Sequence, residues 1–350
     1  MKKIVFLEGS GHGGAEHMTI QYAKILMSHG YTCSALILQQ KRSQNKIQSY
    51  IPKRLRHEVG ISRYRWMIFR IYKFLRKEKP NAVFCSMPDI SILLLLLKII
   101  GLYKGKTIIR ESNMPSRQPK RTRRFAKILY PKANILIAQT LEMKKEMIQT
   151  YGVSAKKVKV INNPTDEETI KKAITIPFQF DCHFVNYVTV GRIAKQKDYI
   201  TALRAFSEVL KVQPNSRYYI IGGDSDSEYV ALVHQEVERL GIMPNVFFEG
   251  FQNNPYKYDY GCDVFVLSSI FEGLPNAMLD AMYLGCPVVA TECIPYIKKI
   301  VHNGENGYTV KVGDYKALAE AMIKATQIKR LHKFIPVNNS TEQILNIFEK

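Results

Sequence analysis

Residues 3–16 read KIVFLEGSGHGGAE, a short apolar run followed by a glycine-rich turn and the start of an amphipathic stretch. The run from Lys3 to Leu7 predicts a buried strand, and the pattern from Ala15 to His29 predicts a helix. Glycines between a strand and a helix let backbone amides approach a phosphate at the positive end of the helix. The spacing of these glycines differs from the dinucleotide-binding fingerprint. The turn alone therefore predicts a βα unit and does not decide whether a ligand binds there.

The same alternation of strand and helix continues outward from this unit. Further strands are expected at residues 31–38, 82–85, 107–109, 135–138 and 158–161, and helices at 64–77, 90–100, 122–129 and 141–150. Strands that alternate with helices of this length indicate βαβ units and a parallel sheet.

The pattern pauses in a polar stretch and then restarts at Phe184. Strands are expected at 184–190, 217–221, 246–249, 264–267 and 287–290. We therefore predict an α/β protein with two doubly wound, Rossmann-like domains, residues 1–165 and 184–350, joined by a linker at 166–183. The last helix could cross back to the first domain. Ligands of such sheets lie beyond the carboxyl ends of the strands, so two facing domains would form a cleft between them.

Cysteine usage and the apolar runs favour a cytoplasmic protein. The six cysteines are scattered without a C-x2-C pair, which argues against a zinc ribbon or a disulfide framework. The apolar stretch before Glu8 is shorter than a signal peptide requires. The run from Ile90 to Ile100 is too short to span a bilayer, so we expect a buried helix there.

The positive charge is concentrated in the first half of the chain. The net charge is +21, divided into +23 for residues 1–180 and −2 for residues 181–350. Residues 41–79 contain 13 basic and 2 acidic residues with several aromatics, and residues 104–132 contain 10 basic residues and one acidic. A basic half of the chain with interleaved aromatic residues indicates that the protein contacts an anionic surface, either a membrane or a nucleic acid. A solvated lysine-rich surface is the plain alternative.

Two segments of the second half carry groups suited to a sugar diphosphate. Arg192 and Lys197 follow the first strand of the second domain, and a fixed pair of cations can stabilise a leaving diphosphate without a metal. Glu272 precedes a turn and Pro275, which suits the first turn of a helix. Its carboxylate can accept hydrogen bonds from sugar hydroxyls. Asp280 lies two helical turns further on. The alternative interpretation of this position is an exposed helix residue without a role in binding.

Taken together, these motifs resemble glycosyltransferase family 4, which has the GT-B fold. The resemblance covers most of the chain. Its motifs are Gly13-Gly14-Ala15-Glu16, Asn162-Asn163-Pro164, Gly191-Arg192 with Lys197, Ile221-Gly222-Gly223, Glu272-x7-Asp280, Gly285-Cys-Pro-Val-Val289 and Asn303-Gly-Glu-Asn-Gly307.

The resemblance implies a role for each matching residue. Arg192 and Lys197 would hold the donor diphosphate, Glu272 would bind hydroxyls of the transferred sugar, and Asp280 would bind the ribose. The turn beside the sugar and phosphate would consist of Gly273, Leu274, Pro275, Asn276 and Ala277. On the remaining sides of the donor, Gly13 and Gly14 would abut the phosphate and Gly250 and Phe251 would receive the base.

Two departures from the family pattern affect these assignments. The family usually has Glu where Asp280 stands, so the carboxylate is one methylene shorter. The first-domain loop that often carries a functional His has none and contains Glu111 and Ser112 instead. Glu16, Glu111 and Ser112 are assigned to the acceptor or sugar side, and neither His12 nor His17 simply replaces the missing residue.

The resemblance also implies a reaction. Enzymes of this family retain the anomeric configuration and need no metal or other cofactor. We expect transfer of a hexose or N-acetylhexosamine from a nucleotide sugar, UDP-linked on family grounds, to a lipid-linked or polysaccharide acceptor at the inner face of the cell membrane. A nonhydrolysing nucleotide-sugar epimerase, a basic nucleic-acid-binding protein and a non-catalytic glycan-binding relative are the alternatives.

Overall fold

The structure is a computed structural model, and it describes residues 2–9, 14–40, 56–61, 64–330 and 340–349. The chain divides into two units. The first consists of Met1–Pro164 together with Asn338–Lys350, and the second of Thr165–Val337. Each unit is described by itself.

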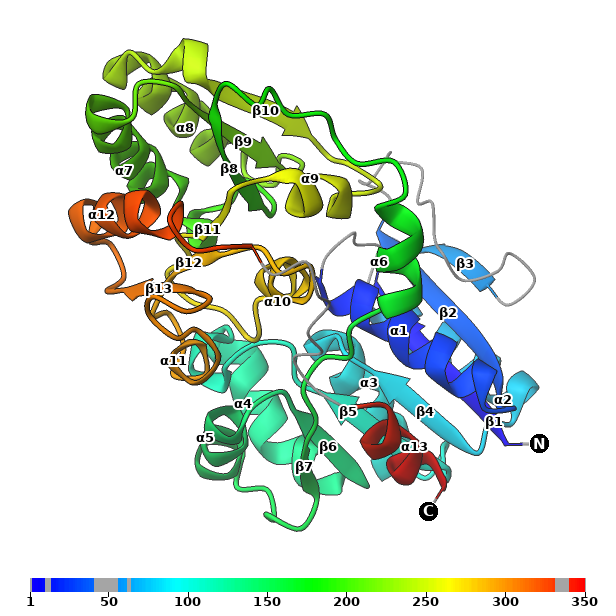
Figure 1. The fold of residues 1–350 in the computed structure, drawn as a ribbon. Coiled ribbons are helices and arrows are strands. Elements are labelled where there is room, and N and C mark those ends of the chain that lie inside the picture. Colours follow the sequence, from blue (N-terminus) through cyan, green and yellow to red (C-terminus); the bar gives the residue numbers. More distant parts are fainter. Residues whose placement is uncertain (1, 10–13, 41–55, 62–63, 331–339, 350) are drawn as a thin grey trace. The chain divides into compact units, whose positions relative to one another are not determined.

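The first unit contains a seven-stranded parallel sheet in the order β3-β2-β1-β4-β5-β6-β7 (Figure 1). Its strands are β1 (Lys3–Glu8), β2 (Thr32–Gln40), β3 (Arg56–Ile61), β4 (Ala82–Cys85), β5 (Lys106–Arg110), β6 (Ile135–Ala138) and β7 (Val158–Val160). Its helices are α1 (Gly14–Ser28), α2 (Tyr64–Glu78), α3 (Pro88–Ile99), α4 (Lys120–Leu129), α5 (Leu141–Tyr151) and α13 (Thr341–Glu349), with short 3-10 helices η2 (Pro115–Arg117) and η3 (Tyr130–Lys132).

Helices cover both faces of this sheet because its strands are apolar on both sides. Val5 and Leu7 face a core built with α2, α3, α4 and α5. Ile4 and Phe6 face the opposite core, which α1 and α13 complete. Helix α13 therefore belongs to the first unit although it ends the chain, and Figure 1 shows it close to the sheet of that unit.

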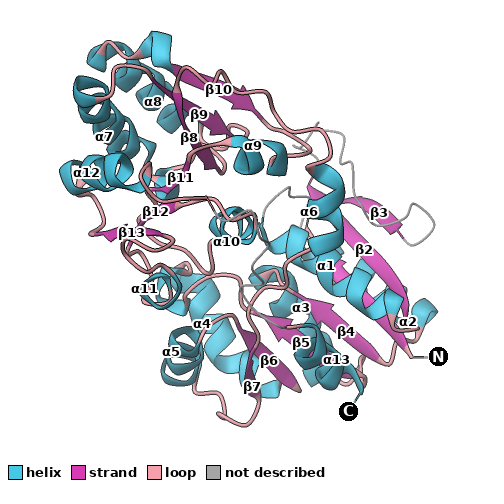
Figure 2. Cartoon of the chain, viewed as in Figure 1, coloured by secondary structure: helices cyan, strands magenta, loops and turns pink. Residues whose placement is uncertain are grey.

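The second unit repeats the architecture with a six-stranded parallel sheet in the order β10-β9-β8-β11-β12-β13 (Figure 2). Its strands are β8 (Val185–Val190), β9 (Ser216–Ile221), β10 (Val246–Gly250), β11 (Val264–Leu267), β12 (Val288–Thr291) and β13 (Gly307–Val310). Its helices are α6 (Glu167–Ala173), α7 (Tyr199–Val212), α8 (Ser227–Leu240), α9 (Tyr256–Gly261), α10 (Asn276–Tyr283), α11 (Ile297–Ile300) and α12 (Tyr315–Ala325), with η4 (Lys195–Lys197) and η5 (Met243–Asn245).

The two cores of the second unit lie on opposite faces of its sheet. Helices α7, α8 and α12 pack on one face, and α9, α10 and α11 pack on the other. In each unit the strand order reverses in the middle of the sheet, between β1 and β4 and between β8 and β11. The prediction of two doubly wound, Rossmann-like domains is confirmed. Ligands of such sheets bind beyond the carboxyl ends of the strands at this switch point.

Three elements differ from the sequence-based expectation. Strand β3 was not predicted because RHEVGI has little apolar content, but it pairs with β2 over six residues. Strand β13 follows the turn at residues 303–306 and pairs with β12. Residues expected to form a plain linker contain α6, which Asp166 caps by accepting a hydrogen bond from the Thr169 amide (3.2 Å). In each case pairing or capping supplies order that local composition does not indicate.

Candidate active site

The loops after β8 and β11 leave the sheet of the second unit at its switch point. The first loop contains Arg192 and Lys197, and the second contains Glu272. The two loops are joined through their backbones, because the Ile270 amide donates to the Gln196 carbonyl at 2.8 Å. The parallel sheet thus brings together two motifs that are 75 residues apart in the sequence.

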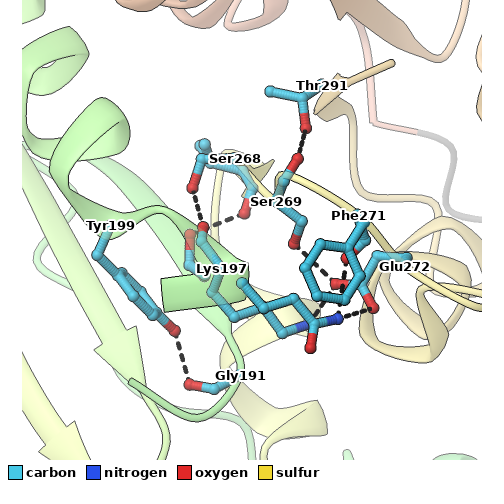
Figure 3. A network of polar contacts seen from close by, with 11 residues as sticks. Gly191, Lys197, Tyr199, Ser268, Ser269, Phe271, Glu272 and Thr291 are labelled. Atoms are coloured by element: carbon cyan, nitrogen blue, oxygen red, sulfur yellow. Dashed lines mark hydrogen bonds and ion pairs between the residues drawn. The ribbon is translucent and has the colours of Figure 1, made fainter. Parts of the chain in front are cut away.

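Lys197 and Glu272 form an ion pair with 2.6 Å between Nζ and Oε1 (Figure 3). Glu272 is buried, and both carboxylate oxygens have further donors. Ser269 Oγ donates to Oε1 at 2.7 Å, and Gln196 Nε2 donates to Oε2 at 3.2 Å. Three donors therefore fix this carboxylate.

A second layer of hydrogen bonds fixes the backbone around the pair. Ser268 Oγ donates to the Lys197 carbonyl at 2.7 Å, and Thr291 Oγ1 donates to the Ser269 carbonyl at 2.6 Å (Figure 3). The Tyr199 hydroxyl donates to the Gly191 carbonyl at 2.6 Å. Sequence reasoning gave these residues no role, because a serine, threonine or tyrosine near a strand end carries no signal of its own.

Arg192 is exposed and forms no hydrogen bond or ion pair with any residue that the structure describes. It follows Gly191, whose backbone lies so close to Gly222 that a Cβ at Gly222 would sit 1.9 Å from the Gly191 oxygen. The site therefore offers one cation already paired with a carboxylate and a second that is available to an anion. This is an arrangement suited to a diphosphate.

The turn after Glu272 leads directly into α10. Gly273, Leu274 and Pro275 are buried, and Asn276 and Ala277 are partly exposed at the start of the helix. The N-cap residue Pro275 provides no side-chain capping hydrogen bond, so the first amides of α10 can serve an external acceptor.

Asp280 lies one turn further along α10 and is partly exposed. Burial raises the pKa of Asp280 to about 7, and the charge of Asp166 adds to this effect.

Gly250 and Phe251 lie at the carboxyl end of β10, on the same edge of the sheet. Gly250 has a positive φ of 63°, and its carbonyl accepts a hydrogen bond from the Gly222 amide (2.8 Å). Phe251 exposes 57% of its surface, and its Cβ is 3.5 Å from the Cβ position at Gly223. An exposed ring beside a glycine backbone is a surface on which a planar base can stack.

The structure describes only some of the residues that were predicted to form the site in the first unit. Gly14 begins α1 and is exposed, whereas His12, Gly13 and the side chain of Glu16 lie outside the described residues. His17 Nε2 is 3.4 Å from Gln21 Nε2 within α1.

Glu111 and Ser112 follow the carboxyl end of β5. Glu111 is 1% exposed, and its carboxylate accepts hydrogen bonds from Gln118 Nε2 (2.8 Å), the Tyr151 hydroxyl (3.2 Å) and the Ser112 amide (3.2 Å). Its side chain points into the first unit and fixes the loop that follows β5. The Glu111 carboxylate is thus enclosed by groups of the first unit, whereas Ser112 stays partly exposed.

Burial raises the pKa of Glu111 to about 7, and this predicts a pH-dependent stability. Between pH 4.5 and 7 the folded protein binds more protons at this site than the unfolded chain, so the free energy of unfolding falls as the pH rises through that range. Glu111→Gln cannot titrate and should flatten the dependence by on the order of 2 kcal/mol between pH 5 and pH 8. Urea unfolding across this range measures it, and parallel curves for the two proteins would contradict the raised pKa.

A buried polar cluster that sequence reasoning also missed lies at the carboxyl edge of the first sheet. Arg110, at the end of β5, is 2% exposed and donates from Nη2 to Asn163 Oδ1. Ser86 Oγ donates to Glu8 Oε1 at 3.3 Å. These residues follow or end β1, β4, β5 and β7, so the edge expected to receive a ligand is polar in this unit as well.

One group of described residues could share a metal ion, namely Asp181, Cys182 and His183. They precede the amino end of β8, whereas the Lys197 and Glu272 pair lies beyond carboxyl ends. Asp181 is also paired with Arg217 at 3.3 Å. The group is therefore separate from the candidate active site.

The sequence of this chain matches the profiles of known protein families. Residues 12–169 match the sequence profile described as Glycosyltransferase Family 4, and residues 185–337 match the profile described as Glycosyl transferases group 1. The chain belongs to glycosyltransferase family 4. The GT-B fold predicted from the sequence is thereby confirmed.

Two relatives differ in their sequence identity to this chain and in the share of it that they match. An uncharacterized glycosyltransferase of Methanocaldococcus jannaschii is 30% identical over 244 residues, which span 64% of this chain but only 59% of that protein. The N-acetylgalactosamine-N,N'-diacetylbacillosaminyl-diphospho-undecaprenol 4-alpha-N-acetylgalactosaminyltransferase of Campylobacter jejuni is 23% identical, and the match covers 95% of this chain and 92% of that enzyme.

Two solved structures show the same fold over nearly the whole chain. Anabaena HepE, crystallised with UDP and glucose, has a TM-score of 0.77 at 18% identity, and the match covers 100% of both chains. The lipopolysaccharide outer core galactosyltransferase WaaB in its apo form has a TM-score of 0.71 at 19% identity, and the match covers 99% of both chains.

Proposed function

We propose that this family 4 glycosyltransferase transfers a hexose or N-acetylhexosamine from a UDP-sugar, with retention of configuration and without a metal, to a glycan acceptor in cell-surface polysaccharide or lipid-linked glycan synthesis. The arrangement of Arg192, Lys197 and Glu272 at the switch point of the second sheet carries this proposal. It provides two cations for a leaving diphosphate and a fixed carboxylate for the sugar.

In the proposed reaction, Arg192 and Lys197 bind the diphosphate and stabilise the charge that develops on it as the glycosidic bond breaks. Glu272 accepts hydrogen bonds from hydroxyls of the sugar, Asp280 contacts the ribose, and Phe251 receives the base. Departure of the diphosphate and attack of the acceptor hydroxyl on the same face preserve the anomeric configuration. The leaving phosphate accepts the proton of that hydroxyl, so no strong protein base is needed.

The donor can be identified without knowledge of the acceptor. UDP is favoured because the similarly folded HepE was solved with UDP and glucose. A thermal-shift panel of UDP-, GDP- and ADP-sugars should show stabilisation by a UDP-sugar, since a ligand at 100 times its dissociation constant adds about 2.7 kcal/mol to stability. Stabilisation by GDP- or ADP-sugars alone would overturn the UDP assignment.

The fixed carboxylate yields a matched pair of variants. Ser269→Ala removes a donor to Glu272 and should lower transfer by about 10-fold or more, since hydrogen bonds to charged groups contribute about 1.5–3 kcal/mol. It should leave UDP affinity unchanged, because UDP lacks the transferred sugar that Glu272 is proposed to contact. Ser268→Ala is the control, since its hydroxyl donates to the Lys197 backbone carbonyl and not to Glu272. Turnover and UDP titration of both variants measure the difference, and equal losses would contradict a role for Ser269 in positioning Glu272.

The proposed acceptor is a lipid-linked or polymeric glycan, and it would bind the first unit at Glu16 and Ser112, with Glu111 positioning the loop that carries Ser112. The name of the Campylobacter jejuni relative specifies a diphospho-undecaprenol acceptor. No described helix is long and apolar enough to cross a membrane. We propose contact with an anionic membrane surface at the inner face of the cell membrane, because residues 1–180 carry a net charge of +23.

Helix α4 offers a face suited to that contact. Arg121, Arg124, Phe125 and Ile128 are spaced three and four residues apart, so they share one side of the helix, and all four are exposed. Phe125 and Ile128 expose 42% and 62% of their surfaces. Cations beside exposed apolar side chains are typical of helices that lie in an anionic membrane surface.

Replacement of Phe125 and Ile128 by serine should reduce flotation with phosphatidylglycerol vesicles by at least about 10-fold, since full burial of each side chain contributes about 1.5–3 kcal/mol. Wild-type flotation should also decrease with salt. Val212→Ser, which changes an exposed apolar residue of the second unit, is the control. Flotation that is the same for all three proteins would count against α4 as the membrane face.

A further inference from the structure

A cavity of about 230 Å³ lies in the second unit, next to the residues that precede β12 and β13. Its wall includes Met282, Ile300 and Ile328, and also Cys286. Because it adjoins the amino ends of strands, it is on the edge of the sheet opposite the loops with Lys197 and Glu272. The proposed reaction makes no use of it.

Cys286 forms a close pair with a second thiol. Its Sγ is 3.3 Å from Sγ of Cys262, and both side chains are buried, with 3% and 2% exposed. The strand register explains the pairing. Phe265 is the partner of Val288, so the residues just before β11 and β12 are neighbours although they are 24 positions apart in the sequence.

Arg330 places a positive charge beside this pair. Its guanidinium donates to the backbone oxygens of Cys262 (2.6 Å), Asp259 (2.7 Å) and Leu284 (3.3 Å). Burial raises the pKa of Cys286, but the hydrogen bond from the Cys262 thiol and the charge of Arg330 outweigh it, and the pKa is lowered overall. Cys33 and Cys85 show the contrast, since burial raises the pKa of each to about 12.

We propose that Cys262 and Cys286 are a modification site, a dithiol that hydrogen peroxide entering by the cavity converts to an intramolecular disulfide. The Cys286 thiolate attacks one peroxide oxygen, the O–O bond breaks, and a sulfenic acid forms with release of water after proton uptake. The Cys262 sulfur, having lost its proton, then attacks the sulfenic sulfur. The S–S bond forms, the S–O bond breaks, and a second water leaves. Two thiols are oxidised by two electrons in total, and one peroxide is reduced to two waters.

The bond would act on α10. The sulfurs must approach from 3.3 Å to about 2.0 Å, and the Cys286 end of this movement lies at the end of α10. The Cys286 amide donates to the Ala281 carbonyl of that helix at 3.0 Å, so the helix is tied to the cysteine. The start of α10 carries Asn276 and Ala277, which are proposed to contact the donor. We therefore expect oxidation to weaken donor binding, an expectation that rests on the proposed function.

The first experiment tests the modification alone. Full-length protein with Cys182→Ser, which removes the exposed thiol, is treated with hydrogen peroxide and mapped by non-reducing peptide mass spectrometry. The expected product is a Cys262–Cys286 crosslink that dithiothreitol reverses, lighter than the reduced protein by two hydrogen atoms. Cys286→Ser and Cys262→Ser should each abolish it, and Cys85→Ser should not. A protein that stays reduced, or that crosslinks through other cysteines, overturns the proposal.

The second experiment tests the coupling to α10. UDP is titrated into the reduced and the oxidised protein, and the oxidised form should bind at least about fivefold more weakly, with recovery after dithiothreitol. The Cys286→Ser variant should bind equally before and after peroxide. Unchanged affinity of a fully crosslinked protein overturns the coupling. If the reduced protein binds neither UDP nor any UDP-sugar, the proposed function fails, and the crosslink result is unaffected.

Discussion

Replacement of Arg192 by alanine is expected to lower turnover by about 10²–10³-fold, the effect typical of removing one preorganised group that stabilises transition-state charge. Arg192 is exposed, stands at the switch point of the second sheet and has no partner among the described residues. Its charge is therefore available to a diphosphate at no cost in broken contacts. Because the leaving group gains charge during the reaction, the loss should fall mainly on kcat, with a smaller rise in KM.

Lys195→Ala supplies the matched control for this experiment. Lys195 is an exposed cation in the same loop, within η4, and it has no role in the proposed reaction. Its removal lowers the local positive charge by the same amount as Arg192→Ala, but it should change turnover by less than about threefold. If both variants lost activity equally, the effect of Arg192 would be general electrostatic attraction and not contact with the diphosphate.

The positions of the main site residues could be predicted because parallel sheets follow a strict rule. Once the apolar runs at residues 184–190 and 264–267 are recognised as neighbouring parallel strands, the loops after them must leave the same edge of the sheet. Arg192, Lys197 and Glu272 therefore come together from sequence alone. The ion pair between Lys197 and Glu272 could not be predicted, because it depends on side-chain conformations that only packing decides.

Other features depend on contacts between distant residues, which no local sequence pattern predicts. Glu111 looks like a polar loop residue, yet Tyr151 and Gln118 enclose its carboxylate. The cysteines show no metal or disulfide spacing, yet strand register brings Cys262 to Cys286. In both cases residues that are distant in the sequence supply the environment, and composition therefore predicts the element but not its partners.

Glu272→Gln is expected to separate sugar recognition from diphosphate binding. The substitution keeps the shape of the side chain but removes the charge that holds Lys197 at 2.6 Å. Transfer should fall by about 10²-fold or more, since the proposed contact with the sugar hydroxyls loses its anionic acceptor. The ligand-free protein should also unfold at a lower temperature, because Lys197 is mostly buried and loses its partner.

The affinity of Glu272→Gln for UDP should not fall, in contrast to its rate of transfer. In the ligand-free protein Lys197 must leave Glu272 before it can reach a diphosphate, so removing the carboxylate removes a competitor. Glu272→Gln should therefore bind UDP at least as tightly as the wild type, whereas Lys197→Ala should bind it about 10-fold or more weakly. Calorimetric titration of UDP into the three proteins measures this. Equal losses in the two variants would mean that the ion pair merely maintains the loop, and that Lys197 does not exchange Glu272 for the donor.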